Sequence, residues 1–205
     1  MNLRWLHITA FVIVVVNWLV FAGFFLLRKR RPRQEAKTSD PRASVPGIVV
    51  QGFAYAAVWA MERPRWTSIV PLPRLLELVP PLVAVALSAA STWLTFAALR
   101  TLGKEWSLEA RLVAGHRLVT AGPYGRVRHP IYTAMCGKLL ATGLVVSHWI
   151  GLLTGLLLIG IGTAIRVRSE EKLLRAEFGA AFEAYARAVP AIVPHPFARG
   201  YTPPA

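Results

Sequence analysis

Acidic residues are scarce in this chain of 205 residues, in which 10 Asp and Glu stand against 24 Lys and Arg. Five segments lack Asp and Glu altogether and consist almost entirely of apolar side chains. A composition with 55% hydrophobic and only 17% charged residues favours membrane helices over a soluble domain. The five segments are residues 3–27, 47–60, 80–99, 131–147 and 149–167.

Cysteine is nearly absent, since Cys136 is the only one. A single thiol excludes an internal disulfide and any metal site built from several cysteines. Histidine offers no substitute, because the spacing of four of the five His residues is not that of metal ligands. The four His residues are His7, His116, His148 and His195. We therefore expect no metal site.

The lengths of the apolar segments decide how many of them can cross a membrane. A helix needs about 20 residues to span a hydrocarbon core of about 30 Å. The first, third and fifth segments meet this length, whereas residues 47–60 and 131–147 are short. We predict an all-α, polytopic integral membrane protein with about five transmembrane helices. Small residues in the fifth segment suit close helix packing: Gly151, Gly155, Gly160 and Gly162.

Basic residues near span ends resist translocation, so their distribution predicts the orientation. Seven Lys and Arg lie in residues 28–42, six in 100–128 and six from 166 onward, against three in 61–79. We predict an outside N-terminus and a cytoplasmic C-terminus in the cell (inner) membrane.

Residues 1–27 could be a signal peptide, but no small-residue cleavage site follows them, so we expect a retained anchor. The net charge of +14 adjoins the apolar spans, which favours anionic lipid headgroups over nucleic acid as the partner.

Two parts of the chain differ in pattern. Residues 1–99 read as three N-terminal transmembrane helices with their loops, and residues 100–205 as a catalytic region in which polar and apolar blocks interleave. Within this region we expect a helical hairpin at about 130–167. An amphipathic surface helix is expected over 170–188, because Leu173, Phe178 and Tyr185 are among apolar residues at helical spacing.

The densest cluster of unusual residues is 122–132. Its Gly-Pro and Pro-Tyr-Gly steps indicate turns, and Pro130 suits the first turn of the helix that follows. Arg128 and His129 then lie at the mouth of a span, with Tyr132 in its first turn. Taken alone, the His and Tyr could equally be interfacial anchors.

A second cluster, at residues 166–171, follows the fifth span and contains Arg166, Glu170 and Glu171. Two adjacent carboxylates at a membrane exit can be a solvated helix start paired with nearby arginines. The tight turn at His148, however, brings the start of the fourth span and the end of the fifth to the same depth. We therefore expect Tyr132 and Glu170 to be neighbours.

The pattern Arg-His-Pro-x-Tyr, a hydrophobic hairpin and then Glu-Glu resembles the isoprenylcysteine carboxyl methyltransferase family and the related phospholipid methyltransferases. The resemblance covers about residues 100–194, including 118–124 before the motif and Phe178-Gly179, Tyr185 and Val189-Pro190 after it. Ala134 departs from the pattern, because these relatives usually have Gly there. The paired motif is specific for the superfamily but not for the substrate.

The resemblance implies a cytoplasmic pocket for S-adenosylmethionine and methyl transfer to a lipophilic, prenyl or lipid-like acceptor. Because a soluble acceptor would not require a transferase anchored by five helices, we expect the acceptor to enter from the membrane. Alternatives are a phospholipid N-methyltransferase, an NADPH-dependent reductase (whose relatives are longer) and a non-enzymatic membrane protein. The residues implied in catalysis are Arg128, His129, Tyr132 and Arg166, and those implied in cofactor binding are Gly122, Tyr124, His129, Pro130, Tyr132, Glu170 and Glu171.

Lys138 lies about two turns inside the fourth span. A charge at that depth is costly and often functional, but a long side chain can also extend to the membrane surface. The sequence leaves both interpretations open.

Overall fold

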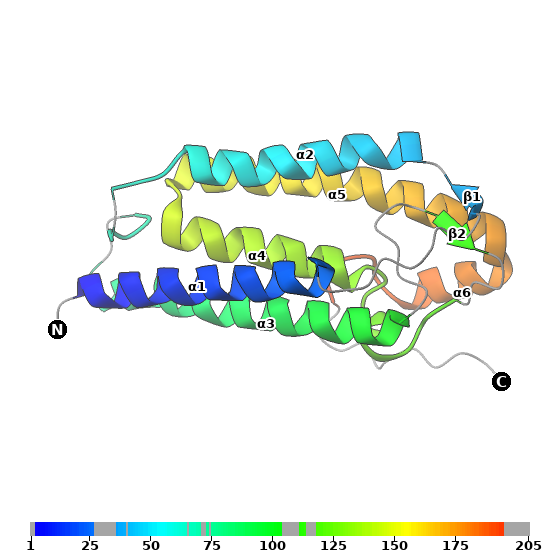
Figure 1. Cartoon of the computed structure of the whole chain (residues 1–205), viewed down its shortest axis with the longest axis horizontal. Coiled ribbons are helices and arrows are strands. Elements are labelled where there is room, and N and C mark those ends of the chain that lie inside the picture. Colours follow the sequence, from blue (N-terminus) through cyan, green and yellow to red (C-terminus); the bar gives the residue numbers. More distant parts are fainter. Residues whose placement is uncertain are drawn as a thin grey trace.

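The computed structural model describes residues 3–26, 36–39, 41–64, 66–70, 73, 75–103, 111–113 and 118–194. Many of the basic residues used to predict the orientation, together with His116 and His195, lie outside these residues. The described part is an elongated bundle of helices that run along its long axis, with α6 at one end (Figure 1). The helices are α1 (Leu3–Leu26), α2 (Pro41–Ala60), α3 (Val79–Leu102), α4 (Pro130–Val146), α5 (Trp149–Phe178) and α6 (Ala180–Ala188).

Within the part of the chain that the structure describes, three helical segments are long and apolar enough to cross a membrane: Leu3–Leu26, Leu76–Leu102 and Trp149–Phe178. The prediction of an all-α membrane protein is confirmed. The apolar helices Ser44–Ala60 and Pro130–Val146 are shorter, so the count of five spans stays a prediction, as does the orientation. A short antiparallel pair, β1 (Ala36–Ser39) with β2 (Arg111–Val113), was not predicted.

The bundle has two layers with α4 between them. Helix α2 packs along α5 and α1 packs along α3, while α4 contacts all four (Figure 1). The α2–α5 contact is close because α5 presents glycines to the α2 backbone. A Cβ added at Gly155 would lie 3.1 Å from the Ala54 carbonyl oxygen, and one at Gly162 would lie 2.8 Å from that of Gly47.

The predicted packing role of the α5 glycines is confirmed for three of the four. Gly151 faces α2 as Gly155 and Gly162 do, since its Cβ would lie 3.2 Å from the Ala57 carbonyl oxygen. The prediction is wrong for Gly160, where an added Cβ would meet nothing within 4 Å. The helix turns this position away from α2, which the spacing of glycines alone does not reveal.

Arg63 closes the end of the bundle that lies away from α6. Its guanidinium donates to four carbonyl oxygens: Thr67 (2.9 Å), Gly143 (3.4 Å), Leu144 (2.9 Å) and Ser147 (2.6 Å). Three of these carbonyls belong to the C-terminal turn of α4 and the residue after it, where helix carbonyls lack intrahelical partners. Burial lowers the pKa of Arg63 to about 10, so the side chain remains charged at neutral pH.

Lys138 is completely buried and does not extend to the surface. Its Nζ donates to Ser88 Oγ of α3 at 3.1 Å and lies 5.7 Å from the centroid of the Trp18 ring of α1. The Trp18 indole in turn donates to Thr142 Oγ1 of α4 at 2.9 Å. Lys138 therefore connects three helices. Its role in the fold is to hold these helices together, and its side chain is not an anchor at the membrane surface.

The prediction of one amphipathic helix over 170–188 is wrong. Helix α5 continues without a break from Trp149 to Phe178, so Glu170 and Glu171 lie inside it. It ends at Gly179, whose φ of 49° is in the left-handed region that favours glycine. The remainder forms the separate helix α6, which buries Phe182 and Tyr185.

Candidate active site

The site is built at the end of the bundle where α4 begins and α5 finishes. A one-turn 3-10 helix, η3 (Gly122–Gly125), precedes α4, and Pro130 occupies the first turn of α4 as predicted. The chain segment after α6 runs beside this entry. The backbone amides of Arg128 and His129 donate to the carbonyls of Pro190 and Ala191, each at 2.9 Å. These bonds fix the Arg-His pair before α4 starts.

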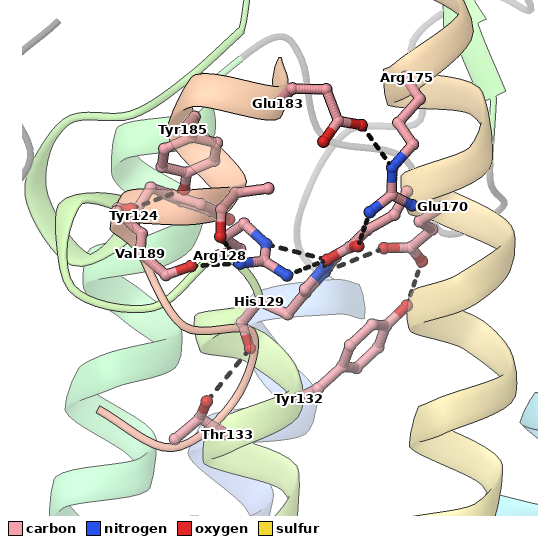
Figure 2. A network of polar contacts seen from close by, with 12 residues as sticks. Tyr124, Arg128, His129, Tyr132, Thr133, Glu170, Arg175, Glu183, Tyr185 and Val189 are labelled. Atoms are coloured by element: carbon pink, nitrogen blue, oxygen red, sulfur yellow. Dashed lines mark hydrogen bonds and ion pairs between the residues drawn. The ribbon is translucent and has the colours of Figure 1, made fainter. Parts of the chain in front are cut away.

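Tyr132 and Glu170 are neighbours, which confirms the prediction from the hairpin. The Tyr132 hydroxyl on α4 donates to Glu170 Oε1 on α5 (Figure 2). Arg166, one turn before Glu170, lies with its guanidinium carbon 5.0 Å from the centroid of the Tyr132 ring. Its Nη2 is also 3.5 Å from Glu170 Oε1. Glu170 is therefore shared between a phenol and a guanidinium, and its side chain is 25% exposed.

Glu171 is the more deeply buried carboxylate and collects several cations. Its Oε1 accepts from Arg128 at 2.7 Å (Nη2) and 2.9 Å (Nε), and its Oε2 lies 3.1 Å from Arg175 Nη2. His129 Nε2 lies 3.2 Å from Oε1. Only 5% of the residue is exposed. Both of its oxygens have protein partners at 3.2 Å or less, whereas among the described residues Oε2 of Glu170 has only the longer contact of 3.5 Å with His129 Nδ1.

Arg128 connects Glu171 to the chain after α6. Besides the two contacts with Glu171, its Nη1 donates to the carbonyls of Ala186 (2.8 Å) and Val189. All three guanidinium nitrogens are thus used inside the protein (Figure 2). This arrangement suits a residue that holds the site together.

His129 lies between the two carboxylates. Its Nδ1 is 3.5 Å from Glu170 Oε2, and its Nε2 is 3.2 Å from Glu171 Oε1. Burial by itself would lower the pKa of His129, but the hydrogen bonds to Glu170 and Glu171 and their charges together raise it above its ordinary value. Because both ring nitrogens face carboxylates, the geometry suits the doubly protonated imidazolium, which can donate from both.

The structure brings together six of the predicted residues: Arg128, His129, Tyr132, Arg166, Glu170 and Glu171. Gly122 and Tyr124 lie outside this group. A Cβ at Gly122 would lie 2.9 Å from Thr101 Oγ1 of α3, and the Tyr124 carbonyl accepts from the Tyr185 hydroxyl at 2.6 Å. Both therefore have contacts that hold the η3 loop in place. Tyr185, Glu183 and Arg175 complete the surroundings. Of these, Tyr185 is part of the resemblance described above, and Arg175 stands four residues after Glu171, at the spacing of a helical ion pair.

Residues 83–176 match the model of the isoprenylcysteine carboxyl methyltransferase (ICMT) family. This segment is similar to the ICMT family. The similarity supports a membrane methyltransferase, in agreement with the apolar helices. No curated protein matches the chain.

The ICMT segment contains all six clustered residues. It includes α4 and almost all of α5, but α1, α2 and α6 lie outside it. The polar contacts of the site nevertheless extend beyond the segment, because Arg128 donates to carbonyls of residues 186 and 189. The part of the chain after the ICMT segment therefore helps to hold the site in its present geometry.

Proposed function

We propose that the chain is an S-adenosylmethionine-dependent methyltransferase that acts on a lipophilic acceptor, with the carboxyl group of an isoprenylcysteine as the leading acceptor. The observation that carries the proposal is the convergence of His129 and Tyr132 from α4 with Glu170 and Glu171 from α5, inside the ICMT segment. Glycine spacing and charge alone would not distinguish this function from that of another membrane protein.

The chemistry of the clustered side chains fits the cofactor. S-Adenosylmethionine carries an ammonium and ribose hydroxyls, which are donors, and a carboxylate, which is an acceptor. Glu170 is partly exposed and can accept from the ammonium or the ribose, while Arg166 and His129 are cations within reach of the same space. Glu171 is better suited to hold Arg128 and His129 in place, because its oxygens are already engaged.

When bound, the cofactor supplies a methyl group on a sulfonium, and the reaction is an in-line displacement. Alignment and proximity provide much of the reduction in the barrier of such a reaction. The residues of the chain therefore act mainly by orientation. Tyr132 is held by Glu170 and by Arg166 over its ring, and His129 stacks on it with centroids 5.7 Å apart.

A lipophilic acceptor accounts for the attachment of the site to apolar helices. The network begins in the first turn of α4 and in the last turns of α5, and α5 exposes Leu153, Leu157 and Ile161 on its apolar part. An acceptor can keep its tail in the bilayer while its reactive head reaches Tyr132 and Glu170. The cofactor is too polar for the bilayer, so we propose that it enters from the water side.

The cofactor is tested by calorimetric titration of the purified protein in detergent. S-Adenosylhomocysteine, the demethylated product, is expected to bind with a Kd on the order of micromolar, which corresponds to about −8 kcal/mol. NADPH is the control and is expected not to bind. Binding of NADPH together with no binding of the adenosyl compound would overturn the proposal in favour of a reductase.

The acceptor is tested by turnover in nanodiscs. An S-isoprenyl cysteine derivative is expected to be methylated at least about tenfold faster than its S-methyl analogue at equal concentration, because each buried CH2 contributes about 0.8 kcal/mol to membrane partitioning. Equal rates for the short analogue would contradict entry from the membrane. Methyl transfer to the amine of phosphatidylethanolamine in vesicles, without transfer to the carboxyl group of the S-isoprenyl cysteine derivative, would assign the chain to phospholipid N-methylation.

A further inference from the structure

We propose that α2, which lies outside the ICMT segment, is part of the active site, and that Gly47 is the positioning residue through which it acts on Arg166. The inference rests on the proposed function, because the effect that we expect on catalysis is an effect on methyl transfer. It extends that function to a helix that carries no motif residue and has no acidic or basic residue from Ala43 to Ala60.

The first observation is the absence of space at Gly47. A Cβ added there would lie 2.5 Å from Cγ of Arg166, 2.8 Å from the Gly162 carbonyl oxygen and 3.3 Å from the Arg166 amide nitrogen. Two of these atoms belong to the backbone of α5 and cannot yield locally. The α2 backbone therefore lies directly against the base of the Arg166 side chain.

The second observation is the position of the Arg166 guanidinium. The Cγ of Arg166 lies against α2, and its guanidinium carbon lies 5.0 Å from the centroid of the Tyr132 ring of α4. Its Nη2 lies 3.5 Å from Glu170 Oε1. Arg166 is 6% exposed, so little alternative space surrounds it. A displacement at Gly47 would therefore be transmitted to Tyr132 and Glu170.

A third observation fixes the register of α2 against α5 at this level. One turn further along α2, the Gln51 amide donates to Thr163 Oγ1 at 3.0 Å, and this bond is buried. A Cβ at Gly162 would in turn lie 2.8 Å from the Gly47 carbonyl oxygen. Gly47, Gly162 and the Gln51–Thr163 bond thus hold the two helices at one separation, and Arg166 projects from the edge of that contact.

The chain offers matched controls for a test. Gly47→Ala introduces a methyl group against Arg166. Gly155→Ala introduces one at a similarly close α2–α5 contact, 2.6 Å from Val58 Cγ2, which involves no site residue. Gly52→Ala places the same methyl on α2 where nothing lies within 4 Å, so it reports the effect of alanine on the helix alone.

The first measurement does not depend on activity. In protein with 15N-labelled arginine, the Arg166 side-chain resonance is identified by its loss in Arg166→Lys. Gly47→Ala is expected to move it towards its position in Tyr132→Leu, because the ring no longer lies beside the guanidinium. Gly155→Ala and Gly52→Ala should leave it in place. An unmoved resonance in Gly47→Ala, or an equal shift in Gly155→Ala, overturns the positioning role.

The second measurement is methyl transfer by folded protein. Gly47→Ala is expected to lower kcat/KM at least about tenfold, and Gly155→Ala to leave it within about twofold. In an Arg166→Ala background, Gly47→Ala should have no further effect, because residues that act through one another are not additive. Additive losses overturn the proposal. If Gly47→Ala does not fold, Gly162→Ala displaces the same turn of α2 and takes its place in both measurements.

Failure of the proposed function and failure of the role of α2 give different results. A parent protein that neither binds S-adenosylhomocysteine nor transfers methyl groups overturns the proposed function, whatever the resonance does. A parent that does both, with a Gly47→Ala variant that equals Gly155→Ala in resonance and in kcat/KM, overturns only the role of α2.

Discussion

Replacing Glu171 by glutamine is expected to destabilise the protein severely, whereas Glu170→Gln should leave it folded and weaken cofactor binding. Glu171 is the only carboxylate that contacts both Arg128 and His129 at 3.2 Å or less among the described residues. Removing one partner of a buried ion pair costs about 3–5 kcal/mol, because the remaining charge has no compensation. Glutamine is isosteric, so the loss is one of charge and not of packing.

Glu170 has a more exposed side chain, and its contacts to His129 and Arg166 are longer, at 3.5 Å each. A hydrogen bond to a charged group contributes about 1.5–3 kcal/mol. Losing one such bond to the cofactor corresponds to an increase of about tenfold to about a hundredfold in Kd. The two variants are therefore expected to separate into one stability defect and one binding defect.

Thermal unfolding in detergent and titration with S-adenosylhomocysteine test this separation. Glu62→Gln, at an exposed carboxylate of the opposite end of the bundle, is the control and should match the parent in both. If Glu171→Gln is as stable as Glu170→Gln, Glu171 does not hold the site together. If both bind the ligand as the parent does, the adjacent carboxylates belong to no cofactor site.

Arg63→Ala is expected to lower the free energy of unfolding by about 3 kcal/mol or more, far from the proposed active site. The substitution removes four hydrogen bonds from a charged donor to backbone carbonyls, each of which contributes about 1.5–3 kcal/mol before solvation of the vacated carbonyls. It also removes a cation from the C-terminus of α4, where the helix dipole favours one. Little effect on ligand affinity is expected in the protein that remains folded.

A graded pair of variants tests the cap. Arg63→Lys keeps the charge but replaces the planar fork by a single ammonium. It should therefore retain about half of the free energy of unfolding that Arg63→Ala loses. Arg168→Ala removes an exposed arginine of α5 and is expected to unfold like the parent. The cap assignment is wrong if Arg63→Ala and Arg168→Ala unfold at the same temperature.

Much of the fold follows from local sequence. Apolar runs of sufficient length predict helices in a bilayer, and the pattern around Pro130 predicts where α4 begins, because proline suits only the first turn of a helix. The same local logic failed at residues 166–171. A change from apolar to charged residues was interpreted as a helix boundary, but no residue there breaks a helix, and α5 continues to Gly179.

Part of the site was also predictable. The short turn at His148 forces two helices to run back along each other, so Tyr132 and Glu170 had to come to a similar depth. The resemblance to the ICMT family added the residues around them. Sequence gave no means to distinguish Glu170 from Glu171, however, because adjacent residues on a helix point in directions about 100° apart, and their partners depend on which helices lie on each side.

The sequence by itself determined the membrane class, the start of α4 and the pairing of Tyr132 with Glu170, since each depends on composition or on neighbouring residues. Only the tertiary structure decided that Arg63 caps α4, that Lys138 is buried against Ser88 and Trp18, and that Gly47 lies against Arg166. Each of these contacts joins residues from different helices. It depends on the lateral order of the helices and on the rotation of each about its axis, which hydropathy and spacing do not specify.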